Sequence, residues 1–131
     1  MYAYFEEKMR KLAVKLGIMM LLSPIFCHVL INEYSASNLS WYTDNYQMEE
    51  DWIELYNTGS TDEDIGGYFL SDDSDEPAKW IIPGGTVISA DGYIVFWCSG
   101  RDEYSDNNYH TNFKLKQSKN NPDHVVFSDP Y

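Results

Sequence analysis

Clustered carboxylates are the side chains best placed to do chemistry in this 131-residue chain. They occur at 49–51, 62–64 and 72–76. Calcium takes roughly six to eight oxygen ligands, which converging acidic loops can supply. None of the clusters fits the calcium-binding helix–loop–helix pattern, so a solvated acidic surface is the main interpretation. The third cluster supplies the calcium candidates Asp72, Asp73 and Asp75, and no other metal or cofactor is expected.

Catalytic side chains do not occur at spacings that indicate an active site. His28, His110 and His124 are scattered, whereas metal-binding histidines usually follow short regular spacings. The chain has no Gly-x-Ser-x-Gly segment and no Gly-rich phosphate loop. We therefore expect no enzymatic activity.

Aromatic residues gather in two long stretches between the expected strands, 37–50 and 99–112. Loops of this length are uncommon in compact domains and are often functional. Their rings either bind a partner or fold back over the end of the fold as plugs. The binding candidates are Trp41, Tyr42, Tyr46, Tyr104 and Tyr109. Of these, Trp41, Tyr42 and Tyr104 could also stack on sugars.

The net charge of −12 disfavours nucleic acid as a partner, because phosphate contacts need clustered Lys and Arg. Basic residues cluster only near the N-terminus. A basic or calcium-bridged protein or polymer surface suits such an acidic chain better.

Short apolar runs separated by Gly, Pro, Asn and Asp predict an all-β fold. We expect strands at 29–35, 52–56, 68–70, 80–82, 86–88, 93–98 and 125–127. That number suits an immunoglobulin-like β-sandwich.

Alternation along the strands assigns residues to the two faces of the sheet. The 93–98 run is apolar on both faces, which predicts a central strand with a loop over its second face. Cys98 is expected to be a buried, inert thiol. The predicted core comprises Ile53, Leu55, Trp80, Ile94 and Phe96.

Glu54 shares a strand face with Trp52 and Tyr56, where an unpaired acid is costly. We expect it to accept hydrogen bonds from backbone amides around 37–38. A ligand-binding carboxylate is the alternative.

An ordered series of short motifs carries a family resemblance. The segments are 31–33 (INE), 36–38 (ASN), 51–57 (DWIELYN), 67–73 (GYFLSDD), 79–83 (KWIIP), 85–88 (GTVI), 92–93 (GY) and 110–115 (HTNFKL). In this order and at these separations they resemble the lamin tail domain, over about 29–128. The family is an immunoglobulin-like sandwich found in nuclear lamins and secreted bacterial proteins. The resemblance implies attachment without chemistry, and structural polar roles for Asn32, Glu33, Asn38, Glu54, Asn57 and His110. His110, before Thr-Asn-Phe, is expected to satisfy loop carbonyls.

The N-terminus has the order of a secretory signal peptide. Basic residues at 8–15 precede the apolar run 16–22, which is too short for a transmembrane helix. We expect a signal-peptide helix at 1–28, with Met9 as an alternative start, and a secreted, cell-surface or periplasmic domain at 29–131. An amphipathic helix of the domain is the alternative. A further strand usually follows in the resembling family, so the domain is expected to be truncated at its C-terminus.

These expectations combine into a non-catalytic binding or attachment module of a secreted, bacterial protein. Its predicted partners are a protein or a cell-surface polymer. Two alternatives stay open: an N-terminal accessory domain of a longer exported nuclease, hydrolase or spore-coat-kinase-like enzyme, and a carbohydrate-binding module. A nuclear-lamina role is disfavoured because no heptad rod precedes the domain.

Overall fold

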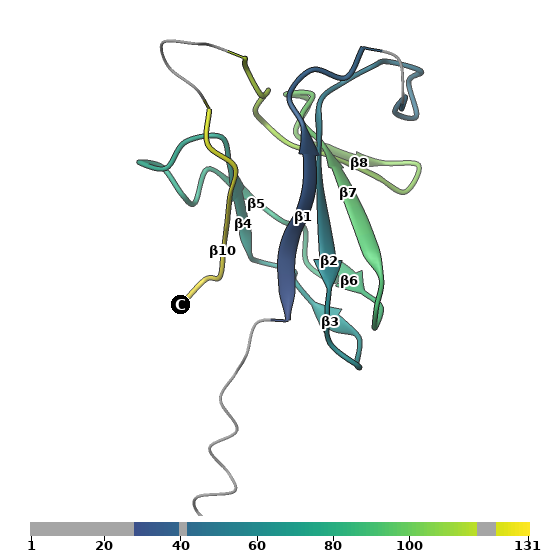
Figure 1. Cartoon of the computed structure of the whole chain (residues 1–131), viewed down its shortest axis with the longest axis vertical. Helices are drawn as coiled ribbons and strands as arrows, with labels where there is room; N and C mark the ends of the chain where they lie inside the picture. The colour runs from purple at the N-terminus through teal and green to yellow at the C-terminus, as the bar shows by residue number, and fades with distance from the viewer. Residues whose placement is uncertain (1–27, 40–41, 118–122) are drawn as a thin grey trace, which may run out of the picture.

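A computed structural model of the chain describes residues 28–39, 42–117 and 123–131. The described residues form ten β-strands and no helix, which confirms the all-β prediction (Figure 1). The strands are β1 (Val29–Ser35), β2 (Trp52–Asn57), β3 (Glu63–Asp64), β4 (Phe69–Ser71), β5 (Trp80–Ile81), β6 (Val87–Ile88), β7 (Tyr93–Trp97), β8 (Glu103–Ser105), β9 (Asn108–His110) and β10 (Val126–Ser128). Each predicted strand is present, with its ends shifted by at most one residue. The predicted signal peptide, except His28, lies outside the described residues.

The larger sheet has five strands in the order β1-β2-β7-β9-β8. β2 pairs antiparallel with both β1 and β7, whereas β9 runs parallel to β7. The central position of β7 is the one predicted from its apolar residues on both faces. Along β1 the register shifts between Ile31 and Glu33, which marks a β-bulge.

A second layer faces this sheet (Figure 1). It contains the three-stranded sheet β10-β4-β5, and a two-stranded sheet joins β3 and β6. The arrangement is an immunoglobulin-like β-sandwich, as predicted. The described residues contain no helix that is long and apolar enough to cross a membrane.

The core fills the space between the layers. Ile53 and Leu55 of β2 and Phe96 of β7 are completely buried, as alternation predicted. Trp80 packs edge-on against Phe96, with ring centroids 5.9 Å apart. Ile94 is only partly buried against this cluster, so it lies at the edge of the core rather than within it.

The stretch 99–112, expected to be a loop, contains the β8–β9 hairpin. Its turn places Asp106 at φ 48° and Asn107 at φ 62°. Asp and Asn tolerate this left-handed region better than most residues and favour tight hairpin turns. The hairpin extends the larger sheet beyond β7.

Candidate functional site

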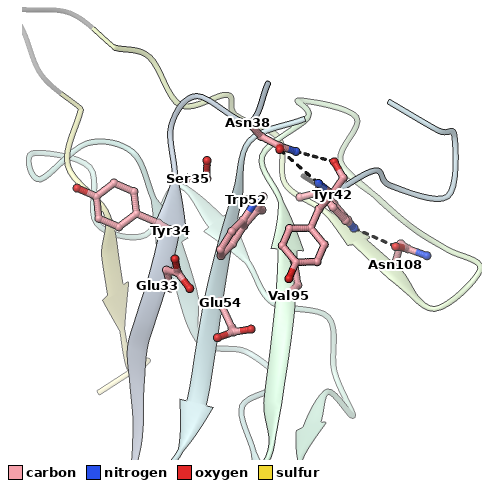
Figure 2. Close-up of a pocket in the computed structure, with 10 residues that line it drawn as sticks. Glu33, Tyr34, Ser35, Asn38, Tyr42, Trp52, Glu54, Val95 and Asn108 are labelled. Carbon is pink, nitrogen blue, oxygen red and sulfur yellow. Dashed lines mark hydrogen bonds between the residues drawn. The ribbon is translucent and has the colours of Figure 1, made fainter. Parts of the chain in front are cut away.

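The outer face of the larger sheet carries a groove of about 550 Å³ (Figure 2). Strands β1, β2 and β7 form its floor, and the segment after β1 forms one wall. Its lining residues are Glu33, Tyr34, Ser35, Asn38, Tyr42, Trp52, Glu54, Val95, Trp97 and Asn108. The groove combines aromatic surface with carboxylates, and it lies on the face opposite the core.

Strand register builds the groove floor. Ser35, Trp52 and Trp97 form one row across β1, β2 and β7. Side chains in such a row are neighbours on the same face of a sheet. The indole Nε1 of Trp97 donates to Asn108 Oδ1 at 2.9 Å, which fixes the orientation of the ring.

Tyr42 makes the aromatic wall above this floor. Its ring lies 5.9 Å from that of Trp52 at an interplanar angle of 85°. Asn38 holds the wall in place, because its Nδ2 donates to the backbone oxygens of Tyr42 at 2.7 Å and Glu50 at 2.9 Å. Trp52 is only 8% exposed whereas Tyr42 is 62% exposed, so the wall stands in solvent above a sheltered ring.

The second row of the floor places two carboxylates opposite each other. Glu33 pairs in register with Glu54, and Glu54 with Val95. Glu54 Oε1 accepts one hydrogen bond, from Asn32 Nδ2 at 2.8 Å. Figure 2 shows both carboxylates in the groove beside the Trp52 ring. Like charges directly opposite on a sheet destabilise the pairing.

The prediction that Glu54 accepts hydrogen bonds from backbone amides around 37–38 is wrong. The backbone amide of Asn38 donates to Asp51 Oδ1 at 3.0 Å, and Glu54 binds Asn32 instead. The reason is geometric: Glu54 lies in the middle of β2, whereas Asp51 precedes the strand and lies beside the loop. The Glu54 side chain is half-buried in the groove.

Beyond the carboxylates, the aromatic surface continues along the same face. Tyr56 and Tyr93 are cross-strand partners whose rings stack with centroids 4.4 Å apart. The Tyr56 hydroxyl donates to Asp91 Oδ1 at 3.3 Å. Desolvation, and then the Asp91 charge, raise the pKa of Tyr56 above its ordinary value. Leu30 pairs in register with Tyr56 and is 44% exposed, so this part of the face is largely apolar.

The loop that carries the wall is fastened by a buried carboxylate. Asp44 Oδ1 accepts the backbone amides of Tyr46 and Met48, each at 2.9 Å. Its Oδ2 pairs with Arg101 Nη1 at 2.8 Å, and the Asp44 side chain is completely buried. The Arg101 guanidinium also lies 4.6 Å from the centroid of the Tyr46 ring. Tyr46 is thus part of the fastening and does not face the groove.

His110 joins this loop to the end of β7. Its Nδ1 lies 3.0 Å from Ser99 Oγ, and its Nε2 lies 2.8 Å from Asn45 Oδ1. The expected partners were loop carbonyls, but these partners are side chains. A serine beside an imidazole can start acyl transfer, but both residues are buried here. Burial lowers the pKa of His110 below its ordinary value.

The other aromatic candidates do not converge on the groove. Tyr104 and Tyr109 pack together with ring centroids 4.5 Å apart. Tyr109 also contacts the core ring of Phe96 at 5.3 Å. Trp41 lies outside the described residues. Tyr42 is therefore the predicted binding residue that the structure places in the groove.

Asn57, at the end of β2, ties the following turn to the sandwich. It is completely buried. Its Nδ2 donates to the backbone oxygens of Thr61 at 2.8 Å and Ile88 at 3.0 Å, and its Oδ1 accepts the Gly59 amide at 2.9 Å. The residue holds backbone groups that would otherwise be buried without partners.

Two of the calcium candidates take part in other interactions. Asp72 pairs with Lys79 at 2.6 Å, and this hydrogen bond raises the pKa of Lys79. Asp73 Oδ1 accepts the backbone amide of Asp75 at 2.9 Å. Across the part of the chain that the structure describes, no three His, Cys, Asp or Glu side chains are grouped to hold a metal ion.

Sequence reasoning missed Trp52, Trp97 and Glu33 as groove residues. The signal was present, since alternation already places Trp52 with Glu54, and Val95 with Trp97, on the face away from the core. What the sequence did not provide was the pairing of β2 with β7 and the register of β1.

Comparisons with known proteins give one match. The family model described as Lamin Tail Domain matches residues 26–130. No curated protein matches the chain, and no solved structure does. The match spans both layers of the sandwich and every strand described above. The chain therefore belongs to the lamin tail domain family.

Proposed function

We propose that this chain is a non-catalytic binding module of an exported protein, and that the groove on the outer sheet face holds a segment of a protein partner. The family consists of immunoglobulin-like modules for protein interaction, which is compatible with this role. The basic and apolar order of the N-terminal residues supports export.

The groove is the observation that carries the proposal. Ligand sites are usually concave, with aromatic surface and a few polar groups that fix orientation. Here Trp52, Trp97 and Tyr42 supply the aromatic surface, and Glu33 and Glu54 supply the polar groups. Aromatic residues are enriched at protein interfaces, because their rings bury large areas.

The ring geometry favours a protein segment over a sugar. Sugar stacking needs a flat ring face that is open to solvent, but Trp52 is 8% exposed and Tyr42 stands almost perpendicular to it. A corner between two rings suits a side chain that projects into the groove. Carbohydrate binding is therefore the alternative that the experiments below must distinguish from peptide binding.

Selection from a random peptide library by the full-length chain tests the proposal. The matched variants are Tyr42→Ala, which removes the wall, and Val95→Arg, which fills the floor. Tyr104→Ala is the control, since Tyr104 is similarly exposed but lies outside the groove. Selected peptides should lose at least about tenfold in affinity for both groove variants and keep it for the control.

Two results would overturn the proposal. One is a set of peptides whose affinity is the same for the chain and for both groove variants. The other is binding to a glycan array, run in parallel, that depends on Tyr42 when peptide binding does not depend on Tyr42. Thermal unfolding of each variant establishes that the fold is retained.

A further inference from the structure

We infer that the groove selects a partner segment that presents an arginine side chain, whose guanidinium lies between the carboxylates of Glu33 and Glu54. The inference rests on the proposed function and names the chemistry of the ligand. Four features of the groove carry it: the bulge in β1, the unpaired charge, the aromatic corner and the apolar surface beside it.

The bulge brings the two carboxylates together. Residues 29, 30 and 31 of β1 lie opposite residues 57, 56 and 55 of β2. After the shift, residues 33, 34 and 35 lie opposite residues 54, 53 and 52, so Asn32 has no partner in the register. Without the shift, Asn32 would lie opposite Glu54, and Glu33 would lie opposite the core residue Ile53. Bulges commonly re-aim a side chain next to a functional site. Here the irregularity places Glu33 on the groove face, opposite Glu54.

The resulting negative charge has no cation beside it in the described structure. The described ion pairs use Lys79 with Asp72, Arg101 with Asp44 and Glu50, and Lys114 with Glu50. The neutral amide of Asn32 is the partner of Glu54. Two carboxylates that face each other without a counterion repel, so a cation entering from outside gains from both.

The aromatic corner provides a second source of attraction for a cation. Trp52 and Tyr42 meet at 85° beside the carboxylates. The face of an aromatic ring attracts cations, and the ring open to solvent here is that of Tyr42, which is 62% exposed. This molecule already makes such a contact elsewhere, where the Arg101 guanidinium lies 4.6 Å from the Tyr46 ring centroid.

Arginine fits this site better than lysine. A guanidinium is planar, offers donors in a fork and can bind two carboxylate oxygens at once while stacking on a ring. The stacked Tyr56–Tyr93 pair and exposed Leu30 give apolar surface for the residues that flank the arginine. The net charge of −12 further steers basic segments toward the chain.

An NMR titration of the full-length chain tests the inference. The probe is the capped tripeptide acetyl-Ala-Arg-Ala-amide, and the neutral comparison replaces arginine by citrulline, which has nearly the same shape. The arginine peptide should shift the indole signals of Trp52 and Trp97, and its affinity should exceed that of the citrulline peptide at least about tenfold. Added salt should weaken its binding.

Charge variants assign the effect to the groove. Glu33→Gln with Glu54→Gln should lower the affinity for the arginine peptide at least about tenfold. The control Asp75→Asn with Glu76→Gln changes the net charge equally at exposed positions outside the groove, and should change affinity less than about twofold. Equal loss in both double variants would mean general electrostatic attraction and would overturn the inference.

The inference and the proposed function fail in different ways. If citrulline binds as well as arginine, or the Glu33 and Glu54 variant binds normally, the arginine assignment is wrong. Peptides from the library would then still depend on Tyr42 and Val95. If no peptide depends on these two residues, the groove is not the binding site and the proposed function fails as well.

Discussion

The carboxylates of Asp44 and Glu54 differ in the charges and hydrogen-bond donors around them. Asp44 is completely buried, yet it accepts two backbone amides and pairs with Arg101. Glu54 is half-buried, accepts one hydrogen bond and faces the like charge of Glu33. Burial alone does not decide what a charge contributes, because its partners determine whether the charge stabilises the fold.

A neutral substitution should therefore destabilise the fold at Asp44 and not at Glu54. Asp44→Asn should lower the free energy of unfolding by about 1–3 kcal/mol, because the ion pair between the buried Asp44 and Arg101 is lost. Glu54→Gln should leave it within about 0.5 kcal/mol of the wild type or raise it, because repulsion from Glu33 is removed. Urea denaturation of both variants measures the difference. A larger loss for Glu54→Gln than for Asp44→Asn would contradict this account.

His110 should make stability depend on pH. Burial lowers its pKa in the folded state from 6.5, so the unfolded chain binds a proton first as the pH falls. Stability should therefore decrease as the pH drops below about 6.5, by up to about 1.4 kcal/mol per pH unit, until the folded pKa is reached. Its charged neighbours are Asp44, Arg101, Glu103 and Glu50.

Denaturation at several pH values measures this effect, and the imidazole signal of His110 in NMR spectra reports its protonation directly. His110→Gln, if folded, should lack the loss of stability in that window. A His110 signal that titrates at or above 6.5 in the folded protein would contradict the prediction.

Strands β2 and β7 organise the molecule at the level of elements. Their inward side chains, Ile53, Leu55 and Phe96, form the centre of the core, while Trp52 and Trp97 form the groove floor. The same pair of strands thus supports the core on one face and the site on the other. Substitutions on the two faces should separate stability from binding.

Phe96→Ala should cost about 3–5 kcal/mol of unfolding free energy, as expected for a completely buried aromatic residue. Tyr93→Ala, three residues earlier on the outer face, should cost only about 0.5–1.5 kcal/mol, mainly through its stacking with Tyr56. Thermal or urea unfolding of the two variants provides the comparison. Similar losses of unfolding free energy in the two variants would mean that side chains on the outer face contribute as much to stability as those in the core.

The apolar strands were predictable from sequence because alternation and turn residues mark them. The β8–β9 hairpin was not, since 103–110 is polar and its apolar character rests on Tyr104 and Tyr109. The Asp106-Asn107 turn between those tyrosines was the available signal. The groove needed information that no local pattern contains: the pairing of β2 with β7, and a bulge that moves Glu33 to the outer face.

At the scale of the whole molecule, the two layers enclose Cys98. It follows β7 and is 1% exposed. Burial raises the pKa of this thiol far above its ordinary value, so little thiolate forms while the sandwich is folded. Alkylation requires the thiolate and access to it, and both require opening of the layers.

Iodoacetamide should therefore label Cys98 only when the whole sandwich unfolds. The labelling rate should rise with urea in parallel with the global unfolding transition. Mass spectrometry of the peptide that contains Cys98 measures this rate separately from that of Cys27. Labelling of Cys98 in the native protein as fast as in the denatured chain would contradict this picture.

The bulge in β1 also has a consequence for self-association. β1 forms an edge of the five-stranded sheet as described, and an exposed edge offers its backbone groups to a second chain. The break in register after Ile31 interrupts the regular spacing that two copies would need to join edge to edge, and Glu33 adds charge beside it. The irregularity that shapes the groove is therefore also expected to disfavour edge-to-edge pairing through this strand.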